Sequence, residues 1–234
     1  MGTTRAGAAR AADHTPDHTP DWPVDELAAR ARELAEDARH AGGRRLLGIV
    51  GAPGAGKSTL AEAICAALGP ALAARVPMDG FHLANRVLRE LGLAERKGSP
   101  PSFDAGGFRA LLRRLRAVDE PVVYAPEFVR EWEEPVAGAL AVPREVPLVV
   151  VEGNYLLLDE GDWHGTPELL DETWFLAPEE TARRERLIAR HLRYGRSRAD
   201  AEAWVASNDD PNARVVAATA HRADRVLRPL SSPR

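Results

Sequence analysis

The chain has 234 residues, of which 44% are hydrophobic, and its net charge is −4. This composition is that of a globular protein with one substantial core, and it excludes a disordered or collagen-like chain. The acidic excess argues against a nucleic-acid surface, which would carry a basic excess. No apolar run approaches the ~20 residues that cross a bilayer, so the sequence predicts a soluble protein without a membrane partner.

The two ends of the chain differ in character from its middle. Residues 1–21 contain a repeated His-Thr-Pro-Asp unit and lack the apolar centre of a secretory signal, so we expect a disordered tail. Residues 230–234 are expected to form a loose C-terminus, which leaves residues 22–229 as a single domain. The lone Cys65 cannot form an intramolecular disulfide and favours a reducing, cytoplasmic location.

Strand-like and helix-like segments alternate along the chain. Strands are predicted at 46–50, 74–78, 147–151, 173–176 and 225–227. Helices are predicted from Pro23 to the Gly42-Gly43 pair, at 58–68, at 108–118, from about 183, and at 199–206. This alternation predicts an α/β fold in which helices cover both faces of a parallel sheet. The β-like stretches 122–124 and 136–142 are interpreted as a small accessory hairpin.

Residues 51–58 read GAPGAGKS and match the Walker A phosphate-binding loop. The motif follows a buried strand and opens a helix, as its chemistry requires, because backbone amides and the helix N-terminus together hold phosphate. Lys57 is expected to reach the β- and γ-phosphates of ATP, and the Ser58 hydroxyl to bind Mg²⁺. The predicted nucleotide-binding residues are Gly51, Ala52, Pro53, Gly54, Ala55, Gly56, Lys57, Ser58 and Thr59.

Asp79 follows the second predicted strand, at the edge of the sheet where the phosphate-binding loop also lies. Its carboxylate could accept the proton of an attacking hydroxyl during phosphoryl transfer. The alternative is a solvated turn aspartate beside Gly80.

Four stretches of the sequence resemble the phosphoribulokinase/uridine kinase family of P-loop kinases. They are residues 78–85 (MDGFHLAN), 96–104 (RKGSPPSFD), 124–130 (YAPEFVR) and 151–158 (VEGNYLLL). Within that family, the similarity is greatest to the fructose-transport-kinase-like proteins and the bacterial pantothenate kinases. The resemblance implies the three-layer P-loop NTPase fold, a core sheet in the order 2-3-1-4-5, and a helical lid.

The resemblance also implies roles for individual residues. Asp79 would act as the base or orient the acceptor hydroxyl, and Glu152, with Ser58, would hold Mg²⁺. The acceptor itself would be bound by Asp79, His82, Tyr124, Phe128 and Arg130. For Arg130 the alternative is a surface salt bridge, and for His82 it is a cap on its own turn.

Arg183, Arg186, Arg190 and Arg193 recur at helical spacing, with Ile188 and Leu192 expected to pack inward. This face is either solvated or belongs to a lid, at about 183–198, that closes over ATP. The family resemblance favours the lid, with Arg190 and then Arg186 as catalytic arginines. Uridine kinases commonly have an aspartate where this chain has His191, so the choice of arginine stays open.

Residues 208–213 (NDDPNA) are interpreted either as a segment near the adenine or as a polar turn with a capping asparagine. Together these features predict a kinase that transfers the γ-phosphate of Mg-ATP to a hydroxyl of a sugar, nucleoside or pantothenate-like metabolite. The alternative is a nucleotide-switched regulatory or assembly ATPase. The acceptor's identity and the oligomeric state, including a homo-oligomer, stay open.

Overall fold

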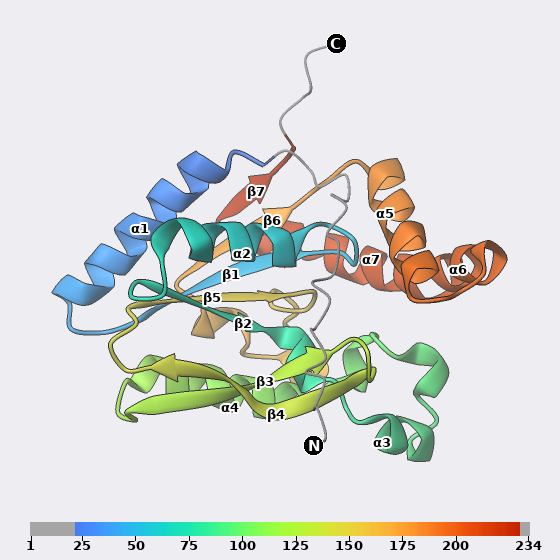
Figure 1. Cartoon of the computed structure of the whole chain (residues 1–234), viewed down its shortest axis with the longest axis horizontal. Helices are drawn as coiled ribbons and strands as arrows, with labels where there is room; N and C mark the ends of the chain where they lie inside the picture. Colours follow the sequence, from blue (N-terminus) through green and yellow to red (C-terminus); the bar gives the residue numbers. More distant parts are fainter. Residues whose placement is uncertain (1–21, 230–234) are drawn as a thin grey trace, which may run out of the picture.

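A five-stranded parallel sheet is the centre of the molecule in the computed structural model, which describes residues 22–229 (Figure 1). Its strands are β1 Arg45–Gly51, β2 Ala73–Pro77, β5 Leu148–Gly153, β6 Glu172–Leu176 and β7 Arg225–Leu227. Their order in the sheet is β2-β5-β1-β6-β7. Counted along the chain, this is the predicted order 2-3-1-4-5, which is confirmed. The predicted tails, 1–21 and 230–234, lie outside the described residues.

Helices cover both faces of this sheet, which explains why β5 is buried along its whole length and apolar up to Glu152. On one face lie α1 (Val24–His40) and α2 (Lys57–Leu68), packed against apolar side chains of β1 and β5. On the other face lie α4 (Ala105–Ala117) and α7 (Asp210–Ala217), as Figure 1 shows. A short helix, α3 (Asn85–Glu90), lies between β2 and α4 in the chain. The predicted three-layer fold is therefore confirmed.

An antiparallel hairpin of β3 (Val122–Val129) and β4 (Glu134–Pro143) packs below the sheet beside α4. It is longer than the sequence predicted, because the polar residues between the two β-like stretches belong to the strands. The hairpin approaches the end of β2 closely. A Cβ atom added to Gly80 would lie 2.3 Å from the carbonyl oxygen of Pro126, so only glycine fits there.

The segment after β6 is helical almost throughout. It consists of α5 (Glu180–Arg193), α6 (Arg198–Trp204), a π-helical turn η6 (Val205–Asp209) and α7. The alternative of a polar turn at 208–213 was wrong, because these residues complete η6 and start α7, with most of their side chains buried.

The expected inward packing of Leu192 was also wrong. Its side chain is 39% exposed. The inner face of α5 is formed by Arg183, Leu187 and His191, which recur at a spacing of four, and Leu192 is rotated by about 100° from that face. Among the helices described between residues 22 and 229, none is long and apolar enough to cross a membrane.

Arg44, just before β1, fastens the base of the hairpin to the sheet. Its buried guanidinium donates hydrogen bonds to the carbonyl oxygens of Val146, Leu115, Pro143 and Arg144 at distances of 2.6–3.2 Å. Burial lowers the pKa of this guanidinium from its usual value. One cation therefore joins the last turn of α4 to the stretch 143–146 at the end of β4.

We expect Arg44→Ala to lower the free energy of unfolding by ~3 kcal/mol, because buried carbonyls lose a charged donor. Urea denaturation would measure this change. Arg39→Ala, at an exposed position in the last turn of α1, is the matched control and should change stability by less than ~0.5 kcal/mol. Equal effects of the two substitutions would show that the Arg44 contacts contribute nothing.

Candidate active site

A cavity of about 920 Å³ lies where the carboxyl ends of β1, β2 and β5 meet, bordered by α5 and by the tip of the hairpin. Ligands of open α/β sheets bind at this edge. The structure brings most of the predicted site residues to its walls: Pro53, Gly54, Gly56, Lys57, Ser58, Thr59, Asp79, His82, Phe128, Arg130, Glu152, Arg186 and Arg190. The predicted residues Gly51, Ala52, Ala55 and Tyr124 are not among those that line it.

The phosphate-binding loop connects β1 to α2. Gly54 and Gly56 have φ values of +80° and +91°, which favour glycine. Gly54 also lies against α5, since an added Cβ would be 2.9 Å from the carbonyl oxygen of Arg183 and 2.8 Å from Leu187. Gly51 is buried at the end of β1, against Ala55 and Leu176. Packing against α5 and β6 therefore fixes the conformation of the loop, and Lys57, Ser58 and Thr59 line the cavity.

Lys57 is held by two acceptors in the floor of the cavity. Its Nζ donates to Asn154 Oδ1 at 2.7 Å and to the carbonyl oxygen of Ala52 at 3.1 Å. Burial lowers the pKa of this ammonium to about 8, although the carboxylates of Glu152 and Asp79 partly oppose the shift. The lysine is thus a poorly solvated cation with neutral hydrogen-bond partners.

Glu152, at the end of β5, is 4% exposed and faces Ser58 of α2. The Ser58 hydroxyl donates to Glu152 Oε1 at 3.1 Å, and Arg75 lies 3.4 Å from the same oxygen. Burial, reinforced by repulsion from Asp79, raises the pKa of the Glu152 carboxyl. Serine and glutamate oxygens suit Mg²⁺, which is usually held by one or two protein oxygens together with substrate phosphates.

Within residues 22–229 there is no cluster of three or more His, Cys, Asp and Glu side chains that could hold a metal without a substrate.

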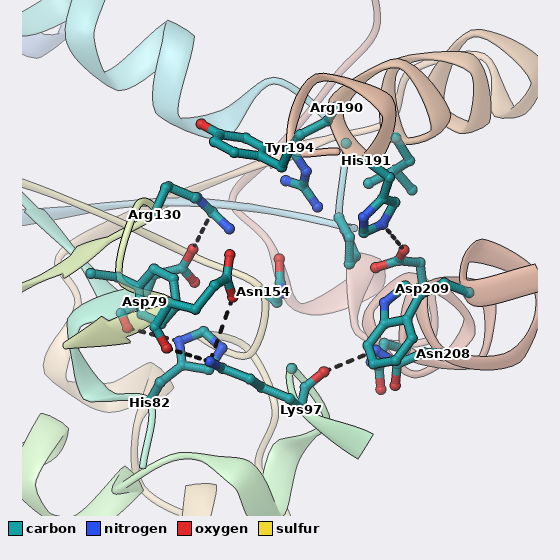
Figure 2. Close-up of a pocket in the computed structure, with 18 of the residues that line it drawn as sticks. Asp79, His82, Lys97, Arg130, Asn154, Arg190, His191, Tyr194, Asn208 and Asp209 are labelled. Carbon is teal, nitrogen blue, oxygen red and sulfur yellow. Dashed lines mark hydrogen bonds and ion pairs between the residues drawn. The ribbon is translucent and has the colours of Figure 1, made fainter. Parts of the chain in front are cut away.

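Asp79 is the second residue of a short 3₁₀ turn (Met78–Phe81) that follows β2, and it faces Arg130 from the hairpin tip (Figure 2). Asp79 Oδ2 accepts a hydrogen bond from Arg130 Nη2 at 3.0 Å. Burial alone would raise the pKa of this carboxyl, but the positive charges of His82, Arg130 and Lys57 lower it. Asp79 is therefore ionised at neutral pH. Arg130 makes this ion pair with a side chain that is 39% exposed, at the rim of the cavity, so the salt-bridge alternative is confirmed and its contact with a substrate stays a prediction.

The acceptor side of the cavity has an aromatic wall. The Phe128 ring lies 4.8 Å from the ring of His82, between the cationic groups of Lys97 at 5.0 Å and Arg130 at 5.3 Å. His82 Nδ1 also hydrogen-bonds the carbonyl oxygen of Asp79 at 2.8 Å, so His82 both caps its own turn and lines the cavity.

Tyr124 does not join these residues. It is 58% exposed and lies four residues before Phe128 on β3, which corresponds to about 13 Å along a strand. Its sequence neighbourhood suggested the acceptor pocket, but that distance along the strand places it beyond the cavity.

The arginines of α5 divide between two positions. Arg183 is buried, binds the carbonyl oxygen of Pro53 at 3.0 Å and pairs with Asp210 at 2.8 Å, so it is not part of a solvated face. Arg186 Nε donates to the carbonyl oxygen of Gly54 at 2.9 Å. Arg190 points into the cavity beside Tyr194, above Asp79 and Asn154 in Figure 2.

Asn208, Asp209 and Asn212 line the cavity and belong to the segment 208–213, which the sequence placed either near the adenine or in a polar turn. Further residues of the cavity were missed by the sequence analysis: Lys97, Asn154 and His191. Asn154 could have been found, because it follows Glu152 by two residues at the same end of β5. The others come from irregular or helical segments, where polar residues carry no signal that separates a cavity wall from solvent.

The site can be compared with known proteins. No protein-family model matches the chain. A Schizosaccharomyces pombe protein described provisionally as a uridine kinase is 33% identical over 76% of this chain and 78% of its own. The Escherichia coli protein YggC is 37% identical over 79% of this chain and 77% of its own. The crystal structure of a Silicibacter protein described provisionally as a fructose transport system kinase has 38% identity. It superposes with a TM-score of 0.75, covering 86% of this chain and 98% of its own.

The buried Glu152 carboxylate makes the fold less stable when it is ionised. We expect Glu152→Gln to raise the melting temperature by about 2–4 °C at pH 8, without nucleotide or magnesium. The carboxyl of Glu152 has a higher pKa in the folded chain than in the unfolded chain. Above the unfolded pKa its ionisation therefore destabilises the folded state, and below that pKa, where both states hold the proton, it has no effect. The gain should therefore vanish near pH 4. Thermal unfolding at both pH values measures this.

Glu62→Gln is the matched control, because the exposed Glu62 also lies near Arg75, at 3.7 Å, and should have little effect. A lower melting temperature for Glu152→Gln at pH 8 would contradict the prediction, since the contacts with Ser58 and Arg75 would then outweigh the cost of burial.

Proposed function

The chain belongs to the uridine kinase-like family of P-loop kinases, which makes it an ATP-dependent small-molecule kinase, and from that premise we propose that it transfers the γ-phosphate of Mg-ATP to a hydroxyl group of a small metabolite. The observation that carries this proposal is the convergence of Lys57, Asp79 and Arg190 on one cavity. A phosphate-binding cation, a carboxylate and a second cation are the groups that in-line phosphoryl transfer to a hydroxyl requires.

Binding of the nucleotide begins at the phosphate-binding loop. The backbone of residues 51–58 and the N-terminus of α2 would surround the β-phosphate, and Thr59 would lie beside them. Lys57 would exchange Asn154 and Ala52 for phosphate oxygens. Its depressed pKa supports this exchange, because a buried ammonium without an anionic hydrogen-bond partner gains most from a phosphate.

Ser58 and Glu152 would hold Mg²⁺ together with the β- and γ-phosphates. The ion, when bound, would supply positive charge between the two phosphates as the bond between them breaks. Arg75, which contacts Glu152 from behind, would keep that carboxylate directed at Ser58.

Asp79 would orient the acceptor hydroxyl and receive its proton. The hydroxyl oxygen forms the new bond to the γ-phosphorus, the bond to the β–γ bridging oxygen breaks, and ADP leaves. In a loose transition state the proton moves late, so a carboxylate with a low pKa serves mainly to align the hydroxyl. Arg130 would hold Asp79 in place, and Phe128 and His82 would border the acceptor.

Residues 183–198 would act as the lid of the single domain formed by residues 22–229. Arg190 would contact the transferring phosphoryl group, where a guanidinium stabilises developing charge. Arg186 is bonded to Gly54 and would support the loop as well as the phosphates. His191 occupies the place of the aspartate common in uridine kinases and binds Asp209 instead, at 3.0 Å.

The proposal is tested with a panel of hydroxylated metabolites that includes sugars, nucleosides and pantothenate. We expect one class to increase ADP release by at least ~10-fold over ATP alone, and mass spectrometry to identify the phosphorylated product. Lys57→Ala should remove this activity, because the loss of a charge on the phosphates costs several kcal/mol of transition-state stabilisation.

Product formation by Lys57→Ala at more than about a tenth of the wild-type rate would contradict the role of Lys57. ATP hydrolysis that no member of the panel accelerates would contradict the kinase proposal itself.

A further inference from the structure

One wall of the cavity is formed by the π-helical turn η6 and the start of α7. Asn208, Asp209 and Asn212, which we call the η6–α7 wall, all line the cavity and are only 5–7% exposed. A π-helical turn adds a residue to a helix, and such turns occur mostly at functional sites. Burying a polar side chain costs folding free energy unless it makes hydrogen bonds, so three such side chains in one wall need an explanation.

Two of these side chains are fixed by neighbours from other segments. Asn208 Nδ2 donates to the carbonyl oxygen of Lys97 at 2.9 Å, which leaves its carbonyl oxygen as an acceptor. Asp209 Oδ2 lies 3.0 Å from His191 Nε2 of α5. Figure 2 shows both contacts on the side of the cavity that faces Asp79 and Arg130. The wall is therefore held rigidly by contacts with the lid and with the loop before α4.

Asn212 differs from its neighbours because its Nδ2 has no hydrogen-bond partner among the described residues. It is 95% buried, since its side chain is 5% exposed. Gly98, with φ of +94°, keeps space in front of it, because an added Cβ would lie 4.0 Å from the Nδ2 atoms of both Asn208 and Asn212. An unpaired buried donor costs about 1–3 kcal/mol, which a bound group could recover.

The wall adjoins the acceptor end of the cavity. Lys97, whose carbonyl oxygen binds Asn208, places its own ammonium over Phe128. The phosphate-binding loop, by contrast, is contacted by Arg183 and Arg186 of α5. A molecule whose reacting hydroxyl lies at Asp79 would extend across the cavity toward the wall.

We propose that the η6–α7 wall binds neighbouring hydroxyl groups of the phosphoryl acceptor, which makes that acceptor a polyhydroxylated molecule such as a sugar or a ribosyl group. This inference rests on the proposed function. A hydroxyl both donates and accepts, so it can donate to the carboxylate of Asp209 and accept from the amide of Asn212. Adjacent hydroxyls match such a set of donors and acceptors.

Charge does not select the acceptor at this wall, because Asp209 already contacts His191 and the cations of Lys97 and Arg130 line the same cavity. The selection rests on the set of hydrogen-bond donors and acceptors, which favours sugars and nucleosides among the acceptor classes of related kinases.

The test compares Asn212→Leu, which removes the polar groups at nearly constant size, with the wild-type enzyme. D-ribose, D-fructose and uridine are the polyol probes, pantothenate is the anionic probe, and ADP affinity is measured by calorimetry. We expect the KM for the preferred polyol to rise ~10–100-fold while the ADP Kd changes less than ~2-fold. The wild-type preference for that polyol over an analogue lacking one hydroxyl should shrink in the variant.

Thr166→Val is the matched control, because Thr166 Oγ1 is also buried without a hydrogen-bond partner among the described residues but does not line the cavity. It should leave every constant unchanged. Asn212→Asp, which keeps the shape and replaces the donor by an acceptor, should reproduce the loss if the leucine variant folds poorly.

A more than ~10-fold weaker ADP affinity would overturn the inference and assign the wall to the nucleotide base. Preferential phosphorylation of pantothenate by the wild-type enzyme would overturn the proposed acceptor class but not the kinase. Failure of the wild-type enzyme to phosphorylate any probe of the metabolite panel would overturn the proposed function, and this inference with it.

Discussion

The candidate site depends on three charges that share one poorly hydrated corner of the fold. Lys57 lies between the carboxylates of Glu152 and Asp79, because parallel strands bring their carboxyl ends to the same edge. Burial lowers the pKa of Lys57 and, with repulsion from Asp79, raises the pKa of Glu152. The pKa of Asp79 is lowered because nearby positive charges outweigh its burial. A bound phosphate and cation would relieve these opposing effects, so the empty fold is electrostatically suited to the nucleotide it is proposed to bind.

Helix α5, the proposed lid, packs directly against the phosphate-binding loop. Gly54 has no room for a side chain because α5 lies against it, and two arginines of α5 bind carbonyl oxygens of the loop. Further along, His191 joins α5 to the η6–α7 wall through Asp209. A movement of α5 would therefore reach the nucleotide side and the acceptor side of the cavity together.

The sequence predicted the parts of the site that depend on local rules. The Walker A pattern indicated Lys57 and Ser58, and the resemblance of residues 151–158 to P-loop kinases indicated Glu152; all three line the cavity. Local rules did not predict side chains whose burial depends on a partner far away in the sequence. Arg183 is buried because Asp210, 27 residues later, pairs with it. For residues 208–213 the sequence left two interpretations open, because a π-helical turn has no sequence periodicity that would show Asn208 and Asp209 lining a cavity.

The central claim is that Asp79 serves the acceptor and not the nucleotide, and Asp79→Asn tests it most directly. Mg-ATP affinity by calorimetry and phosphorylated product by mass spectrometry are measured on the same preparations. The account predicts an affinity within ~3-fold of wild type and a product rate lower by ~10²–10⁴, because the amide keeps the shape but cannot align the hydroxyl or take its proton. Loss of Mg-ATP binding, or undiminished transfer, would contradict it.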